Sequence, residues 1–430
     1  MFTNFSRRRN ISVSALAWKF IALMKNIFVK ALNHIRTKGI RSFLYKSFIF
    51  VFSYIALIFA PIFWVLRIRV PVSSNMYRAM GHLAVEMDLY VKEGILGMRP
   101  AYRSILFVTE KKVINKCLLN YWRKYHLFII DYEPLGLLLA KVLKLKSIGY
   151  DLDRYITTFD KGTAIAAIQN QYYPRGPVLE LTDFDHARGW AALAALGISK
   201  DSWFVCVHAR DGGNHKYQWA HNLRDVDINN YVVAMQEIVR RGGWVIRMGD
   251  MGMKTLPAME KIIDYAHLDI KNDWMDIFLC ASCKFFLGSS SGPVNVANVF
   301  GVSGIQTNVA LPFSGILPYG SKDIGIPKLM WSLKDQRYLT FKEIFSSPLA
   351  NYRFSNDILE NSIRLDENSP EEIRDVTIEM LDRLEGKLEY TSEDECRQER
   401  FKALMNETHF SFGSMSRIGK DFLRKYEYLL

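Results

Sequence analysis

The sequence lacks acidic residues over its first 85 positions, where 13 lysines and arginines stand without one aspartate or glutamate. The first acid is Glu86, and residues 86–430 then carry 43 basic and 44 acidic side chains. The formal net charge of +12 therefore belongs to the N-terminal region alone. Because what a charge attracts depends on where it stands, the body of the protein is not expected to bind polyanions such as nucleic acid.

Cysteine is also scarce, with five residues at positions 117, 206, 280, 283 and 396. This odd, sparse set excludes a small secreted domain held by disulfides and indicates a reducing compartment. Cys280 and Cys283 form a C-x-x-C pair, but no second pair completes a zinc site, so we predict two buried structural thiols. The sequence has neither G-x-G-x-x-G nor G-x-x-x-x-G-K-[ST], which argues against a dinucleotide fingerprint and a P-loop.

Two apolar stretches fill the basic region. Residues 11–32 read as an amphipathic helix edged by lysines, and residues 47–64 carry no charge. Pro61 is expected to end the second helix, which would then cover 43–60, short of the roughly 20 residues that cross a bilayer. We therefore favour an interfacial or re-entrant anchor formed by residues 1–62, with a single span as the alternative.

The charges around these stretches give a second argument. Ten positive charges precede residue 47 and would keep the N-terminus in the cytoplasm, so one crossing would export the rest of the chain. Long apolar runs between the charges suit lipid better than nucleic acid. We expect the protein on the cytoplasmic face of the inner membrane.

After the anchor, strand-like and helix-like stretches alternate, which is typical of α/β proteins. The turn at 197–201 separates residues 63–198 from residues 199–345, and we expect a domain in each. Residues 346–430 contain a helix start at Ser369-Pro370 and are expected to form C-terminal helices that pack back on the first domain.

Three strands in the second half end in polar residues, at 208–211, 247–250 and 289–292. The carboxyl edge of an open parallel sheet is where ligands bind, so we expect these ends to face one site. Ser291, Gly292 and Pro293 resemble a helix N-terminus, which attracts phosphate, and Arg210 and Arg247 offer forked cationic donors. Their chemistry suits a nucleotide-sugar. The predicted donor-binding residues are His208, Arg210, Arg247, Gly249, Ser289, Ser290, Ser291 and Gly292.

These motifs also carry a family resemblance. The segments HARDGG, RGGWVIRMGD, DYAHLDIKNDWMDIFLCASCKFFLGSSSG, IPKLMWSLKDQRYLTFKEI and MGHLAVEMDLY resemble bacterial glycosyltransferases of surface-polysaccharide loci, over about residues 64–385. The resemblance implies a GT-B fold, two Rossmann-like domains facing across a cleft, with the donor held by the C-terminal one and no metal. The chain is more distantly similar to O-fucosyltransferases, whose His-x-Arg motif would assign donor binding to His208 and Arg210.

Glycosyl transfer also needs a group that takes a proton from the acceptor hydroxyl. His82 and Glu86 stand four residues apart around a helix start, so they are expected on one face of that helix. Asp211 directly follows Arg210, one of the predicted donor-binding residues. Each has a structural alternative, such as loop packing for His82 or a first-turn acid for Glu86. Asp273 and Asp276 fit a helix cap better than a metal pair, so we predict no metal.

Together these features predict a metal-independent, inverting glycosyltransferase. It would move a sugar from a nucleotide-sugar, used as co-substrate without another cofactor, to a saccharide or lipid-linked acceptor in cell-surface polysaccharide biosynthesis. Inversion is implied only by the similarity to the fucosyltransferases. The alternative is a non-catalytic GT-B-like scaffold or carbohydrate-binding component of a polysaccharide assembly complex, which has no need of clustered cationic strand ends.

Overall fold

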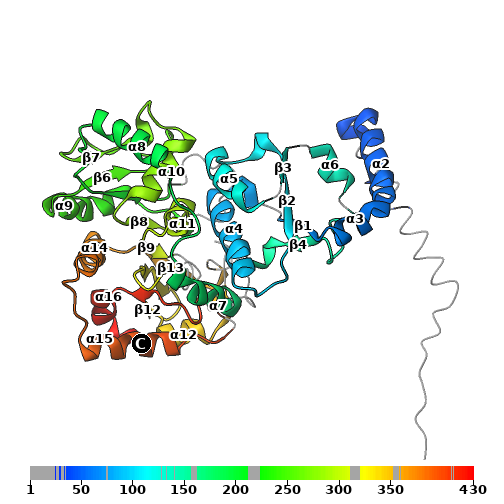
Figure 1. Cartoon of the computed structure of the whole chain (residues 1–430). Coiled ribbons are helices and arrows are strands. Elements are labelled where there is room, and N and C mark those ends of the chain that lie inside the picture. Colours follow the sequence, from blue (N-terminus) through cyan, green and yellow to red (C-terminus); the bar gives the residue numbers. More distant parts are fainter. Residues whose placement is uncertain are drawn as a thin grey trace, which may run out of the picture. The chain divides into compact units, whose positions relative to one another are not determined.

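The structure is a computed structural model of the whole chain (Figure 1). It describes residues 35–73, 76–126, 128–131, 133–139, 141–155, 162–211, 223–309, 320–351, 360–407 and 411–430, with single residues at 25, 29, 30, 33, 358 and 409. The chain divides into two compact units. The first joins residues 1–68 to residues 132–149, and the second holds residues 69–131 and 150–430.

The first unit contains one long helical run. It consists of α2 (Ile40–Ile55), the 3-10 turn η1 (Ala56–Phe59) and α3 (Ala60–Val65). The predicted helix end at Ala60 is wrong, because the chain tightens into the 3-10 turn and Pro61 then lies in the first turn of α3, where proline is tolerated. The run of 26 residues is long and apolar enough to cross a membrane, by length and composition. The predicted helix at 11–32 lies almost entirely outside the described residues.

Within the same unit, α6 (Glu133–Leu138) packs against α2. The turns that follow α6 place the Lys141 ammonium 4.5 Å from the ring centre of Tyr54 and 5.1 Å from that of Phe50. Residues 132–149 therefore belong with the N-terminal helices, although the chain on either side of them forms strands of a sheet.

That sheet has four strands in the order β3-β2-β1-β4, with β2 and β3 parallel. The strands are β1 (Ile68–Val72), β2 (Arg103–Val108), β3 (Phe128–Asp131) and β4 (Gly149–Asp151). The helices of this part of the chain are α4 (Met80–Ile95), α5 (Lys116–Trp122), α7 (Gly162–Tyr172) and α8 (Asp183–Ala195). Helix α4 packs against α5 and α7, whereas α8 packs against α10 (Asp273–Ser282) beside the second sheet.

The alternating and apolar patterns predict strands over 63–70, 104–110 and 127–131 and a helix over 84–94. Strands β2 and β3 lie in the predicted stretches, but β1 begins only at Ile68 because Trp64 and Val65 still belong to α3, and α4 begins at Met80, four residues early.

The second sheet has seven parallel strands, in the order β14-β10-β9-β8-β5-β6-β7. They are β5 (Phe204–His208), β6 (Trp244–Arg247), β7 (Ile262–Ile263), β8 (Phe286–Ser289), β9 (Gly304–Val309), β10 (Ile324–Pro327) and β14 (Arg417–Ile418). The helices α9 (Val232–Arg240), α10 (Asp273–Ser282) and α11 (Gly292–Val299) connect its strands. Strand β5 is buried along its whole length, as its continuous apolar run predicts.

The C-terminal segment supplies strands as well as the predicted helices. Strand β14 extends the seven-stranded sheet, and β13 (Ile363–Asp366) pairs antiparallel with β11 (Leu329–Ser332), which also pairs with β12 (Arg337–Tyr338). Helix α14 (Pro370–Leu384) packs on α9. Most described contacts of this segment are with the second sheet, although Asn170 of α7 donates a hydrogen bond of 2.8 Å to the Gly413 carbonyl.

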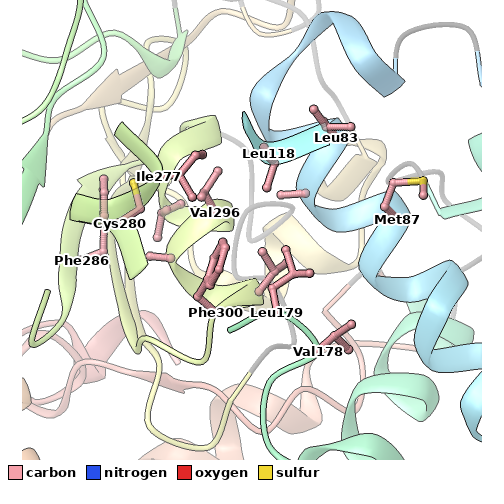
Figure 2. Close-up of a cluster of buried hydrophobic side chains, with 14 of the residues drawn as sticks. Leu83, Met87, Leu118, Val178, Leu179, Ile277, Cys280, Phe286, Val296 and Phe300 are labelled. Carbon is pink, nitrogen blue, oxygen red and sulfur yellow. The ribbon is translucent and has the colours of Figure 1, made fainter. Parts of the chain in front are cut away.

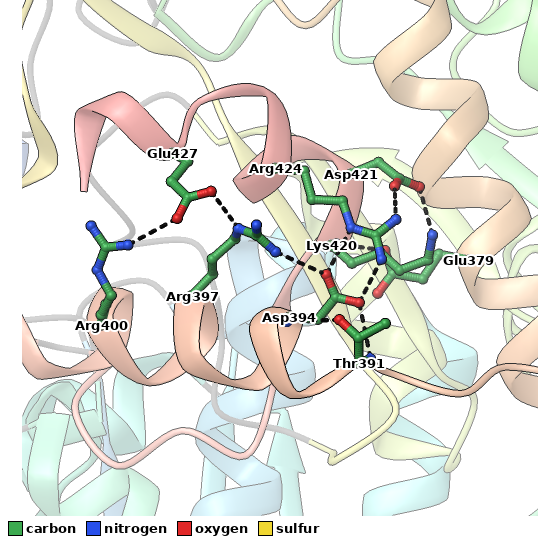
Figure 3. A network of polar contacts seen from close by, with 9 residues as sticks. All are labelled: Glu379, Thr391, Asp394, Arg397, Arg400, Lys420, Asp421, Arg424 and Glu427. Atoms are coloured by element: carbon green, nitrogen blue, oxygen red, sulfur yellow. Dashed lines mark hydrogen bonds and ion pairs between the residues drawn. The ribbon is translucent and has the colours of Figure 1, made fainter.

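Ion pairs fasten the last two α-helices, α15 (Ser392–Ala403) and α16 (Lys420–Lys425), to each other (Figure 3). The Arg424 guanidinium donates to both oxygens of the buried Asp394, at 2.7 and 2.6 Å. Glu427 accepts from Arg397 and Arg400 of α15. These ion pairs hold α16 and the C-terminal residues that follow it against α15.

A hydrophobic core connects the two predicted halves (Figure 2). Leu83 and Met87 of α4 and Leu118 of α5 share one buried cluster with Ile277 of α10 and Val296 of α11. Helices α4 and α11 pack directly against each other. Along these helices the halves are joined by continuous side-chain packing and not by an open cleft.

Candidate functional site

The seven-stranded sheet reverses direction between β5 and β8. From β5 the chain adds β6 and β7 on one side, then returns to place β8, β9, β10 and β14 on the other. Ligands of such open parallel sheets bind at the carboxyl edge where the order reverses. The two strand ends at this point are in contact, because the Arg210 amide donates a hydrogen bond of 2.9 Å to Ser289 Oγ.

His208 closes β5 and is only 4% exposed. Burial lowers its pKa to about 4, with the Arg247 charge acting in the same direction, so its ring is neutral near pH 7. Its Nδ1 atom is buried and has no hydrogen-bond partner among the described residues. A neutral ring with an unused nitrogen at the sheet edge can donate to or accept from a bound ligand.

Three cationic side chains surround Asp225 at this edge. Arg210 Nε lies 3.5 Å from the Asp225 carboxylate, and Lys328 Nζ donates to the Asp225 carbonyl at 3.1 Å. Arg224 precedes Asp225 in the chain, and its buried Nε atom has no partner among the described residues. Glu367 lies 3.7 Å from Lys328.

Desolvation acts on all three cations. Burial lowers the pKa of Arg210 and of Lys328. It also lowers the pKa of Arg224 to about 10, and repulsion from the charge of Arg210 adds to the effect. Buried cations that repel one another are stabilised by an anion, which this edge of the sheet can accept.

Arg247 is fully buried, at the end of β6. Its Nη1 atom lies 3.0 Å from Asp264 Oδ1, and its Nη2 atom donates to the Lys254 carbonyl at 3.0 Å. The carboxylate that pairs with Arg247 is therefore that of Asp264. The adjacent Gly249 leaves room for Met253, whose sulfur would lie 2.7 Å from a Cβ at that position.

The N-terminus of α11 follows Ser289 directly. Ser290 and Ser291 are half-buried, Ser291 is the N-cap in extended conformation, and its side chain makes no capping hydrogen bond. Gly292 opens the helix beside Gly81, since a Cβ on Gly292 would lie 2.8 Å from the Gly81 amide nitrogen. The close approach brings the first turn of α4 against the first turn of α11.

That first turn of α4 carries His82. His82 Nδ1 lies 2.6 Å from Glu86 Oε1, so the two side chains share one helix face, as their spacing predicts. Glu86 is 1% exposed and also accepts from Ser73 Oγ at 3.2 Å, whereas the His82 side chain is 39% exposed. The bond to Glu86 raises the pKa of His82, and burial raises the pKa of Glu86. Arg224 lies near enough for its charge to act on His82.

Asp211, the third candidate base, is half-buried and accepts a hydrogen bond of 3.1 Å from the Lys254 amide. Gly212 and Gly213 follow Asp211 in the sequence, where glycines would let a ligand approach the backbone closely, and they lie outside the described residues. The structure therefore brings together His208, Arg210, Ser289 and the α11 N-terminus, and places the His82–Glu86 pair beside that helix end.

Comparison with solved structures finds four similar chains, among them two glycosyltransferases. A glycosyl transferase family 9 protein from Veillonella parvula DSM 2008 is 13% identical, with a TM-score of 0.42 over 74% of this chain and 96% of that chain. The Escherichia coli ADP-heptose lipopolysaccharide heptosyltransferase II is 12% identical, with a TM-score of 0.39 over 74% of this chain and 98% of that one. No protein-family model matches the sequence. No curated protein matches it.

Sequence reasoning did not find Arg224, Asp225 or Lys328. Lys328 follows the end of β10, so the strand-end argument could have found it, whereas no sequence motif marked Arg224 and Asp225. Sequence reasoning did not find Ser73 either, which donates to both Glu86 and Asp153.

Two other features contribute nothing to this site. A cavity of about 60 Å³ lies among acidic side chains of α14 and α16, including Glu371, Glu379 and Asp421, and none of the candidate site residues lines it. Asp273 and Asp276 stand in the first turn of α10, as predicted, and Asn272 caps that helix. No group of three or more candidate metal ligands occurs within the described part of the chain.

Proposed function

We propose that this protein is a glycosyltransferase of GT-B type, which transfers a sugar from a nucleotide-sugar to a saccharide or lipid-linked acceptor in cell-surface polysaccharide biosynthesis. The observation that carries the proposal is the hydrogen bond between the Arg210 amide and Ser289 Oγ at the reversal of the sheet. It brings a guanidinium, a neutral histidine and a helix N-terminus to one place, where a diphosphate can bind.

In the proposed reaction the acceptor oxygen attacks the anomeric carbon, and the bond from that carbon to the donor phosphate breaks. The leaving nucleotide gains negative charge, which Arg210 and the amides of the α11 N-terminus stabilise, with Arg224 and Lys328 as neighbouring cations. Buried cations are effective here because little water screens them. A single displacement of this kind inverts the anomeric centre.

The acceptor proton would pass to His82. Its Nδ1 atom is bonded to the buried Glu86, so the tautomer with Nδ1–H donating to Glu86 leaves Nε2 free to accept the acceptor proton. Glu86 then stabilises the imidazolium that forms, and Ser73 holds Glu86 in place. Among the three candidates, only His82 combines an exposed ring with a buried carboxylate behind it.

We further propose that the first unit associates with the cytoplasmic face of the inner membrane, which would keep the site near both nucleotide-sugars and a membrane-bound acceptor. Its support is the apolar run Ile40–Val65, in which only Ser53 and Ala56 are buried, and the basic charge around it.

Donor hydrolysis tests the enzymatic proposal. The purified protein would be incubated with a panel of nucleotide-sugars, and the released nucleotide measured over hours. We expect slow hydrolysis of one donor, together with a rise in melting temperature caused by the matching nucleotide. Indifference to every nucleotide in both assays would favour the alternative, a non-catalytic component of a polysaccharide assembly complex.

A further inference from the structure

We propose that residues 133–149 complete a membrane-binding module with the helical run Ile40–Val65, and that this module is embedded in one leaflet of an anionic membrane instead of crossing it. The inference rests on the proposed membrane association and adds a second chain segment and a mode of insertion. The two segments are remote in sequence but belong to one compact unit, in which α6 packs against α2 (Figure 1).

The charge of this unit is of one sign. Residues 1–68 and 132–149 contain 14 lysines and arginines and one acid, Glu133. Such a surface is complementary to anionic lipid headgroups. Residues 133–149 contribute Lys141, Lys144 and Lys146, and both of the last two are exposed. A protein partner would have to supply many acids to match the same surface.

The apolar surface of the unit points to the same partner. Of the 28 large hydrophobic side chains that are exposed in the described residues, 16 lie between positions 29 and 66, and a seventeenth is Leu145. Leu145 stands between the exposed Lys144 and Lys146, with Val142 and Ile148 buried beneath. An exposed leucine flanked by lysines suits the boundary between headgroups and acyl chains.

The position of Lys141 decides how the module lies. Its ammonium stacks on Phe50 and Tyr54, which stand near the middle of the run Ile40–Val65. If the run crossed the bilayer, Lys141 would lie near the centre of the hydrocarbon core, where a lysine is costly and cannot reach the headgroups. Insertion in one leaflet keeps the aromatic rings in lipid and the ammonium at the headgroups.

Depth-dependent fluorescence quenching tests whether residues 133–149 contact the membrane and whether the helical run is inserted in one leaflet. In the full chain with Cys117→Ser and Cys396→Ser, an environment-sensitive fluorophore would be attached at Leu145→Cys, at Phe52→Cys or at the control Lys200→Cys. Each protein is reconstituted into phosphatidylcholine–phosphatidylglycerol bilayers that carry a spin label at a shallow or a deep position of the acyl chain. We expect the Leu145 and Phe52 labels to be quenched most by the shallow spin label, and the Lys200 label not to be quenched.

Each of the other outcomes of the quenching experiment would overturn one part of the proposal. Quenching at Phe52 without quenching at Leu145 would remove residues 133–149 from the module while leaving membrane association intact. Strongest quenching of the Phe52 label by the deep spin label would show a crossing helix. No quenching at either position would contradict membrane association itself, and a second copy or a protein partner would then have to cover the apolar surface.

Charge reversal provides a second measurement that needs no label. The double variant Lys144→Glu/Lys146→Glu should bind vesicles containing phosphatidylglycerol at least about 30-fold more weakly, because the loss of two surface lysines alone has that effect and the new carboxylates add repulsion. Its binding to pure phosphatidylcholine vesicles should change little. The matched control Lys200→Glu/Lys334→Glu reverses the same charge at exposed positions of the second unit. Equal effects of both double variants would contradict the proposal. Donor hydrolysis is measured separately and tests the enzymatic function alone.

Discussion

Gly81 and Gly292 meet where α4 crosses α11, so closely that a Cβ on Gly292 would lie 2.8 Å from the Gly81 amide nitrogen and one on Gly81 would lie 3.1 Å from Gly292 Cα. For Gly292 the nearest obstacle is backbone, which cannot turn aside as a side chain can, whereas a Cβ on Gly81 would also lie 2.8 Å from the Asn295 side chain. The contact joins the helix that carries His82 to the helix that opens the strand-end site. The proposed base on α4 and the proposed donor-binding end of α11 are therefore held in position by the same helix crossing.

The substitution Gly292→Ala should force α4 and α11 apart. We expect the free energy of unfolding to fall by about 1–3 kcal/mol, as for an overpacked core, and donor hydrolysis to fall more than stability does. Chemical denaturation and released nucleotide are the measurements. The control Gly320→Ala adds a Cβ whose nearest neighbours lie at an ordinary 3.5 Å. Equal stability of the two variants would contradict the close crossing.

The pH dependence of hydrolysis should report on His82. A general base acts when neutral, so the rate should increase with pH through the raised pKa of His82. Glu86→Gln removes the partner that raises this pKa, and the increase should then begin at lower pH, with a lower maximum. His82→Ala should lose about 10²–10⁴-fold in rate. The exposed His186→Ala is the control, and a pH profile unmoved by Glu86→Gln would exclude His82 as the base.

Arg210→Ala should abolish the rise in melting temperature that a nucleotide produces and lower kcat/KM for hydrolysis by about 10²-fold, because one charge-stabilising donor is lost. Arg210→Lys should keep only part of the melting-temperature rise and of the kcat/KM of the parent protein, since a lysine cannot donate in a forked geometry. Differential scanning fluorimetry and initial rates are the readouts. Arg374→Ala removes a half-exposed arginine paired with Asp375, and it should leave both readouts unchanged.

Asp323 should make stability depend on pH. Its buried carboxylate accepts hydrogen bonds from the Gly304 and Gly320 amides, at 2.7 and 2.8 Å, and burial raises its pKa to about 6. A carboxyl group whose pKa is raised by folding favours the protonated folded state. Its contribution to the free energy of unfolding should therefore decline by about 3 kcal/mol between roughly pH 4 and 6.

The variant Asp323→Asn lacks this titration, so its stability relative to the parent should improve as pH rises through that range. Urea denaturation at several pH values measures the difference. Asp269→Asn, at an exposed position, controls for the loss of a surface carboxylate. A difference between variant and parent that stays constant with pH would refute the assignment.

Local sequence pattern predicted much of the second half. Continuous apolar runs before His208, Arg247 and Ser289 gave strands, because burial on both faces of a parallel sheet requires such runs. The spacing of His82 and Glu86 likewise predicted a shared helix face. The helix end predicted from Pro61 was wrong, because a local 3-10 turn accommodates the proline and no residue near it indicates that turn.

The sequence by itself determined the charge asymmetry, the strands that end in polar residues and the helix start at Ser291, since these depend on neighbouring residues and on burial periodicity. Only the tertiary structure decided that Arg247 pairs with Asp264, that Arg224 and Lys328 join Arg210, and that residues 133–149 pack on α2. Such partners are remote in sequence, and a charged side chain takes whichever counter-charge the packing brings within reach.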